Sequence, residues 1–123
     1  MAIVNSGSIS LNIYNSISPL SNNISGLLLT IVEQNVFYVE QFTGASIPVS
    51  SIDEQYQLPI TNLATANILK LMAVQDNGVN SVSVGDLTTE NSNLITMAQS
   101  YQDLANTQLK QLTNSFYSFK ARG

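Results

Sequence analysis

Carboxylates are the side chains of this chain that could perform acid–base or metal chemistry, because it contains no histidine and no cysteine. Histidine is the commonest general base and transition-metal ligand, and without thiolates a conventional zinc site is also excluded. The eight Asp and Glu residues are spread out, with one adjacent pair at Asp53 and Glu54. This pair could begin a hard-cation site, but a solvated pair near a helix start is the simpler interpretation.

Two further acidic segments are weak candidates for a site. Residues 76–78 (Asp-Asn-Gly) are similar to the start of a calcium loop but lack its later ligands and closing glutamate. Asp86 and Glu90 could act together across a loop, although loop polarity or capping of the next helix explains them more simply. No serine lies in a catalytic motif, and no Gly-rich phosphate loop is present. We therefore expect no enzyme activity, no metal and no cofactor.

The composition favours a small domain with a weakly charged surface. A chain of 123 residues fits one domain and can bury a substantial core. Hydrophobic residues make up 44%, whereas charged residues make up 10%, against about 25% in soluble proteins generally. Ser, Thr, Asn and Gln fill about two-fifths of the chain. Such a surface allows copies of one protein to pack together with little electrostatic repulsion.

The net charge of −4 argues against a nucleic-acid-binding protein. The chain has four basic residues, of which only Lys120 and Arg122 lie close together in sequence, whereas tight phosphate binding needs a clustered patch. No apolar run approaches the roughly 18 residues of a membrane span. The N-terminus lacks the basic region of a signal peptide, so we expect neither membrane insertion nor export by that route.

The N-terminal segment alternates in polarity. Within residues 5–14, Ile9, Leu11 and Ile13 are separated by serine and asparagine, which is the period of a half-buried strand. We interpret residues 1–20 as an extended N-terminal arm that reaches a neighbouring subunit. A short strand folded back on its own domain, or a disordered tail, would also fit this pattern.

Two segments predict helices in the first two-thirds of the chain. Apolar residues recur every three or four positions over residues 22–43, and Gly44 follows where a left-handed residue would end that helix. A second helix is predicted to begin at residue 54 or 59 and end at 75, with Pro59 suited to a first turn. Its apolar residues cover most of its circumference, which indicates a central helix.

The C-terminal third contains an extended loop and a third helix. Residues 79–84 alternate after a turn signal, which predicts a strand or short hairpin. The third helix is predicted from residue 91 or 92 to about 114, before a tail at 116–123. The expected fold is mainly α: a small bundle of three to four helices within 21–115, with an extended inter-helix loop or hairpin and extended arms at both ends.

Three segments together resemble the head–tail connector (adaptor, DNA-packaging) family of phages. Residues 39–44 (VEQFTG) are similar to that family's I-E-x-Y-T-G helix end, and residues 59–66 to its P-x-x-L-x-x-A core helix. Residues 82–87 resemble its S-x-G-D loop before the last long helix. The sequence departs from the pattern at Ala45, where the family often has arginine, and before residue 20, which has no counterpart.

The resemblance implies a structural virion protein at the head–tail junction. Identical subunits, commonly twelve, would form a closed ring beneath the portal protein. Double-stranded DNA would pass through the ring without sequence-specific binding, and the far side would receive a stopper, a tail terminator or the tail. Another helical phage subunit, from tail completion or a baseplate, remains an alternative, as does a non-viral helical module that binds a protein.

The resemblance also implies that the C-terminal tail binds the portal. Phe116, Tyr117 and Phe119 would be the anchors, since aromatic residues dominate interface energetics, and Lys120 and Arg122 would lie at the polar rim. Burial of Phe116 in the chain's own core is equally compatible with its position.

Two other groups are candidates for contacts between subunits. The loop would contact a neighbouring subunit or the channel lumen through Ser83, Val84, Gly85 and Asp86. Gly85 could instead serve only the backbone geometry of a turn. The N-terminal arm would use Ile9, Leu11 and Ile13.

Overall fold

The computed structural model describes residues 5–18, 20, 22–75, 81–84, 87–90 and 93–122, except for the side chains of 75, 81, 87, 89, 90 and 114–122. Five helices form most of it: α1 (Ser6–Ser16), α2 (Asn22–Ser25), α3 (Leu28–Thr43), α4 (Glu54–Gln75) and α5 (Leu94–Arg122). Three short strands accompany them: β1 (Ile17–Ser18), β2 (Ser81–Val84) and β3 (Leu87–Glu90). The predicted mainly α fold is confirmed.

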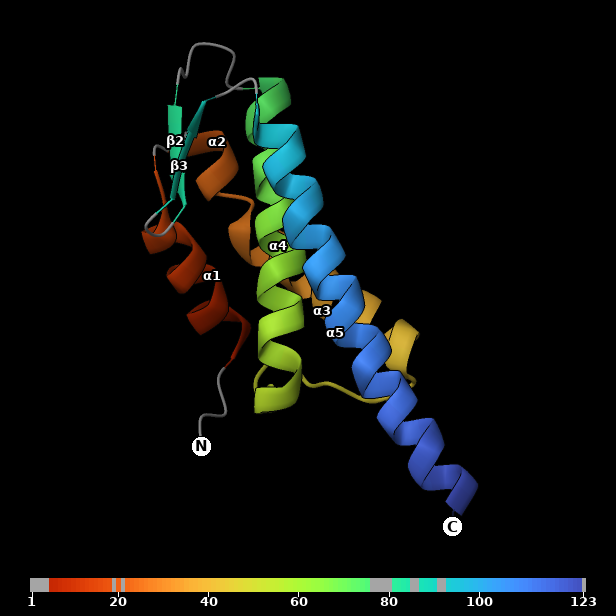
Figure 1. Ribbon diagram of the computed structural model, residues 1–123. Coiled ribbons are helices and arrows are strands. Elements are labelled where there is room, and N and C mark those ends of the chain that lie inside the picture. Colours follow the sequence, from red (N-terminus) through yellow and green to blue (C-terminus); the bar gives the residue numbers. More distant parts are fainter. Residues whose placement is uncertain are drawn as a thin grey trace.

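Helix α4 is the centre of the fold, as its apolar circumference predicts. It packs most extensively against α5 and α3, and it also contacts α1 and α2 (Figure 1). Its buried apolar side chains point in several directions around the helix; they are Ile60, Leu63, Ala64, Ala66, Ile68, Leu69 and Met72. Because α4 begins at Glu54, Pro59 lies inside the helix and not in its first turn, and its missing N–H removes one intrahelical bond.

The helix expected over residues 22–43 is divided in two. A turn at Gly26 and Leu27 separates α2 from α3, with the Gly26 N–H donating to the carbonyl of Asn22 at 3.0 Å. Glycine has a low helix propensity, which explains a break at this point. The other end agrees with the prediction: Gly44 follows α3 with φ 74°, and its N–H donates to the carbonyl of Glu40.

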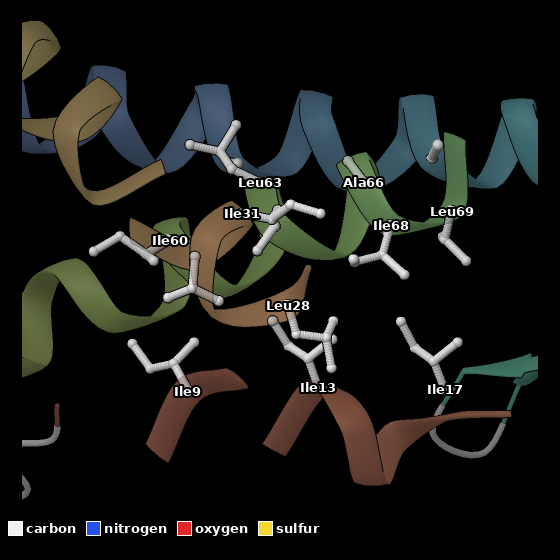
Figure 2. Packing of buried hydrophobic residues seen from close by; sticks show 14 of the residues in the cluster. Ile9, Ile13, Ile17, Leu28, Ile31, Ile60, Leu63, Ala66, Ile68 and Leu69 are labelled. Carbon is white, nitrogen blue, oxygen red and sulfur yellow. The ribbon is translucent and has the colours of Figure 1, made fainter. Parts of the chain in front are cut away.

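The expected N-terminal extended arm is wrong over residues 6–16, which form α1. Ile9 and Ile13 are four residues apart, so they share one face of a helix as well as one face of a strand. Both are buried, as is Ile17, and Figure 2 shows all three directed at residues of α3 and α4 such as Leu28 and Ile60. The segment is therefore part of the chain's own core.

The predicted strand between the second and third helices is confirmed as β2, which forms a hairpin with β3. The three strands lie in the order β1-β2-β3, all antiparallel. Val84 pairs with Leu87 in the hairpin and with Ile17 of β1. The two residues of β1, immediately after α1, therefore pair with a strand more than 60 residues later in the chain. This pairing joins the N-terminal segment to the hairpin that precedes α5.

The expected extended C-terminal arm is also wrong, because α5 continues to Arg122. No proline or glycine interrupts the chain between Leu94 and Arg122, so no residue in this range strongly opposes the helix. Figure 1 shows the last turns of α5 projecting beyond the end of α4. Within the described helices, none combines the length and hydropathy needed to cross a membrane.

Candidate functional site

The predicted portal-binding residues lie on the last two turns of α5. The backbone of Phe116, Tyr117, Phe119, Lys120 and Arg122 is helical, while their side chains lie outside the described part of the molecule. These turns belong to the projecting end of the helix (Figure 1). The structure thus brings the five residues together on one helical segment at the edge of the fold.

Helix α5 is held against α4 by a mixed apolar and polar seam. Its buried side chains recur along one face; they are Leu94, Ala98, Ala105 and Leu109. Two polar contacts join the helices: the Asn62 amide donates to the Gln108 side-chain oxygen at 3.1 Å, and Lys70 donates to Gln102. Among the described side chains of α5, Leu109 is the last that is fully buried, so the helix is anchored up to that residue.

Charge is segregated between this projecting end and the rest of the chain. Residues 110–123 contain three of the four basic residues and no acidic one, which gives a formal charge of +3. Residues 1–109 contain Lys70 and all eight acidic residues, which gives −7. A cationic, projecting helix end is suited to docking on an acidic protein surface.

The predicted loop site is only partly available for contacts. Ser83 is half-buried, and its hydroxyl lies 3.2 Å from that of Thr88 across the hairpin. Val84 is buried in the core, so the prediction that it contacts a neighbouring subunit is wrong. Gly85 and Asp86 lie outside the described residues.

The predicted N-terminal site divides between core and surface. Ile9 and Ile13 are 2% and 1% exposed and cannot reach a neighbouring subunit without unfolding α1. Leu11 is 59% exposed, because it points away from the helix face that those two residues share. Tyr14, one turn further along, is 52% exposed.

The most aromatic part of the described surface was not predicted from the sequence. On α3, Phe37, Tyr38 and Phe42 are 61%, 44% and 38% exposed, and the rings of Tyr38 and Phe42 lie 6.2 Å apart between centroids. The periodic pattern assigned Tyr38 and Phe42 to the core-facing stripe. The signal that would have excluded them is the Val32, Val36 and Val39 series, which marks the buried face.

The two carboxylates of α3 are partly buried, and each accepts a hydrogen bond. Glu33 accepts a hydrogen bond from the Ser6 hydroxyl of α1 at 3.2 Å. Glu40 accepts one from the backbone N–H of Ile47 at 2.7 Å, which fixes the loop after Gly44. Both carboxylates lie one helical turn from Phe37, so they border the exposed aromatic part of the helix.

A groove of about 250 Å³ lies between α3, α4 and α5. Its polar lining consists of neutral side chains: Asn35, Asn67 and Gln102 with the Tyr38 phenol. Asn35 donates to the carbonyl of Ile31 at 2.8 Å, which fixes that amide. Within the described ranges, no three carboxylates lie close enough together to hold a metal ion. Neutral hydrogen bonding and apolar contact are what this groove can provide.

Comparison of the chain with protein-family models, with curated proteins and with solved structures gives no match. Two features distinguish the surface of the protein. They are a projecting cationic helix end and exposed aromatic and aliphatic side chains on helices with few free charges. Both are typical of proteins that bind other proteins.

Proposed function

We propose that this protein is a structural subunit of the adaptor ring beneath a phage portal, where it extends the DNA channel and docks the tail or a stopper. The observation that carries the proposal is the location of the three segments that resemble connector proteins. Residues 39–44 end α3 at a left-handed glycine, residues 59–66 lie in the central helix, and residues 82–84 and 87 lie in β2 and β3 before α5. The order of these segments along helix end, central helix and inter-helix connection supports the proposal.

The mechanism of such a subunit is geometric and electrostatic. Copies in a closed ring, commonly twelve, would surround the DNA with bodies of formal charge −7. A channel with net negative charge does not hold phosphate, so the duplex slides instead of binding. The cationic ends of α5 would project from the ring toward the portal, with Phe116, Tyr117 and Phe119 as anchors and Lys120 and Arg122 at the rim.

Removal of residues 114–123 tests the docking role. The described core ends at Leu109, so the shortened chain is expected to fold with an unchanged unfolding midpoint. It is expected to lose binding to the purified portal of the same phage, measured by co-sedimentation. Equal sedimentation of the shortened and full-length chains with the portal would contradict the proposal.

A charge-matched pair of variants separates the rim contacts from net charge. Lys120→Gln with Arg122→Gln lowers the charge by two at the projecting end, and Thr96→Glu with Thr107→Glu does so on exposed positions elsewhere on α5. The first pair is expected to weaken portal binding and reduce its salt dependence, while the second leaves both unchanged. Absence of portal binding in the parent chain would favour a tail-completion or baseplate subunit.

A further inference from the structure

Asn35 is a buried amide on an otherwise apolar face of α3. Its side chain is 6% exposed, and it shares the buried face with three valines, Val32, Val36 and Val39. The Nδ2 of Asn35 donates to the carbonyl of Ile31, and because a carbonyl can only accept, this bond identifies which amide atom is the nitrogen. Within the described part of the chain, no group donates a hydrogen bond to the Oδ1 of Asn35. Buried polar atoms are nearly always paired in folded proteins, so this oxygen needs a partner.

The hydrogen bond that Asn35 does make gives no reason for an amide at this position. In an α-helix the carbonyl of Ile31 already accepts the backbone N–H of Asn35, so the side-chain bond satisfies no group that would otherwise be unpaired. A leucine has a similar volume and would bring no buried oxygen without a donor, which destabilises a fold. A residue that opposes local stability in this way is typical of a binding site.

Gln102 of α5 lines the same groove as Asn35. Its side-chain oxygen accepts a hydrogen bond from Lys70, and because an ammonium group can only donate, the Nε2 of Gln102 is the atom left to donate. The groove thus contains one acceptor and one donor, each on a side chain that a bond through its other polar atom holds in place. Groups fixed in this way lose little conformational entropy when they bind a ligand.

The rest of the lining suits a small, neutral ligand. Leu63 and Ala66 of α4 are 6% and 1% exposed and provide apolar contact, and the phenol ring of Tyr38 lies at the exposed side. The volume of about 250 Å³ is smaller than the roughly 300–1,000 Å³ of sites for drug-sized ligands. None of the described side chains that line the groove is charged, so an ionised group would lose hydration there without gaining an ionic partner.

We propose that this groove binds a neutral carboxamide, the group present in peptide bonds and in the side chains of asparagine and glutamine. The N–H of the ligand donates to the Oδ1 of Asn35, and its oxygen accepts from the Nε2 of Gln102, so one planar group supplies both missing partners. Binding here does not require the connector function, because the lining residues lie on α3, α4 and α5 before residue 103, away from the proposed portal-docking segment.

Two isomeric amides test the class of ligand and its source. Propionamide has the primary carboxamide of a glutamine side chain, and N-methylacetamide has the secondary carboxamide of a peptide bond. Titrated into the full chain, at least one is expected to shift the NMR signals of the Asn35 and Gln102 side-chain amides and the Leu63 and Ala66 methyl groups. A Kd on the order of 10 mM is expected for ligands of this size. Tighter binding of propionamide would identify a side-chain amide as the natural ligand group, and tighter binding of N-methylacetamide a peptide bond.

Two matched compounds without an N–H are the ligand controls. N,N-dimethylacetamide keeps the amide oxygen, and propionate keeps the shape of propionamide but is charged. Both are expected to bind about tenfold more weakly or less, since neither can donate to the Oδ1 of Asn35. Equal binding of N,N-dimethylacetamide, tighter binding of propionate, or the absence of shifts with both isomeric amides would overturn the proposal.

Variants of the chain separate binding from a structural role. Asn35→Leu is expected to abolish the amide-induced shifts while the unfolding midpoint stays equal or rises, because the buried oxygen is removed. Gln102→Glu can still accept from Lys70 but cannot donate, and it is expected to weaken binding about 2- to 10-fold. Gln108→Glu makes the same change where the side chain accepts from Asn62 outside the groove, and binding is expected to be unchanged. Unaltered amide binding in both Asn35→Leu and Gln102→Glu would overturn the proposal; if Asn35→Leu does not fold, Gln102→Glu decides alone.

Discussion

Two segments of this chain have a similar alternation of small polar and aliphatic residues and fold differently. Residues 8–13 become part of α1, and residues 81–84 become β2. Both bury two apolar side chains in the same core: Ile9 and Ile13 in one case, Val82 and Val84 in the other. The alternation alone does not determine whether a segment becomes a helix or a strand.

Local partners account for the difference. Asn5 caps α1 by accepting a hydrogen bond from the Ser8 N–H at 2.8 Å, and Ile9, Ile13 and Ile17 recur every four residues. The strand β2 has β3 immediately after it, and Val84 pairs with Leu87, so its ladder forms at low entropic cost. The consequence for the surface is that α1 leaves Leu11 and Tyr14 exposed, whereas β2 buries both of its valines.

The largest expected effect is on the buried face of α1. Ile13→Ala is expected to lower the free energy of unfolding by about 2–5 kcal/mol, since a side chain only 1% exposed is lost from the core. Leu11→Ala, at an exposed position, is expected to change it by no more than about 0.5 kcal/mol. Urea unfolding followed by circular dichroism measures both. Equal effects would mean that the segment is an arm and not a core helix.

A proline on the exposed face tests the backbone of α1 separately. Leu11→Pro is expected to cost about 3 kcal/mol or more, because proline removes an intrahelical hydrogen bond and clashes with the preceding turn. Leu11→Ser, which changes the same exposed side chain, serves as the control. If urea unfolding shows the two variants to be equally stable, residues 6–16 are not helical in solution.

A smaller effect is expected in the strand. Val82→Ala removes two methyl groups from a side chain that is 1% exposed and is expected to cost roughly 1–2 kcal/mol. Ser83→Ala, on the opposite face of β2, loses only an exposed hydroxyl contact with Thr88 and is expected to cost less. Urea unfolding compares the two variants. If Ser83→Ala lowers the free energy of unfolding more than Val82→Ala, residue 83 and not residue 82 faces the core.

The smallest expected effect is at the cap that distinguishes the two segments. Asn5→Ala is expected to cost about 1 kcal/mol, because the N–H of Ser8 loses its acceptor. Asn5→Ser keeps a side-chain oxygen at the same position and is expected to retain most of the stability. Hydrogen exchange at the first turn of α1 measures the difference, and identical protection in both variants would exclude a role for the cap.

The helices with unambiguous patterns could be predicted from the sequence. The central position of α4 follows from its apolar circumference, and the end of α3 at Gly44 follows from glycine's tolerance of positive φ. The hairpin follows from short alternation beside turn residues. At the N-terminus, two spacings fit the same isoleucines, and the choice depends on packing against α3 and α4 that no local pattern contains.

The surface was less predictable than the core. Tyr38 and Phe42 fit an apolar stripe by spacing, yet the valines of α3 occupy its buried face and both rings are left exposed. Val84 was expected at an interface as part of the inter-helix loop, but it pairs with Ile17 and is buried. Both differences arise because exposure depends on which elements pack together, which one segment's sequence does not specify.

Cryo-electron microscopy of the phage particle, or of this protein mixed with its portal, tests the connector function most directly. The expected result is a closed ring of this chain against the portal, with residues 114–123 at the contact. Density for the chain in a tail tube or baseplate, or no association with the portal, would contradict the connector function.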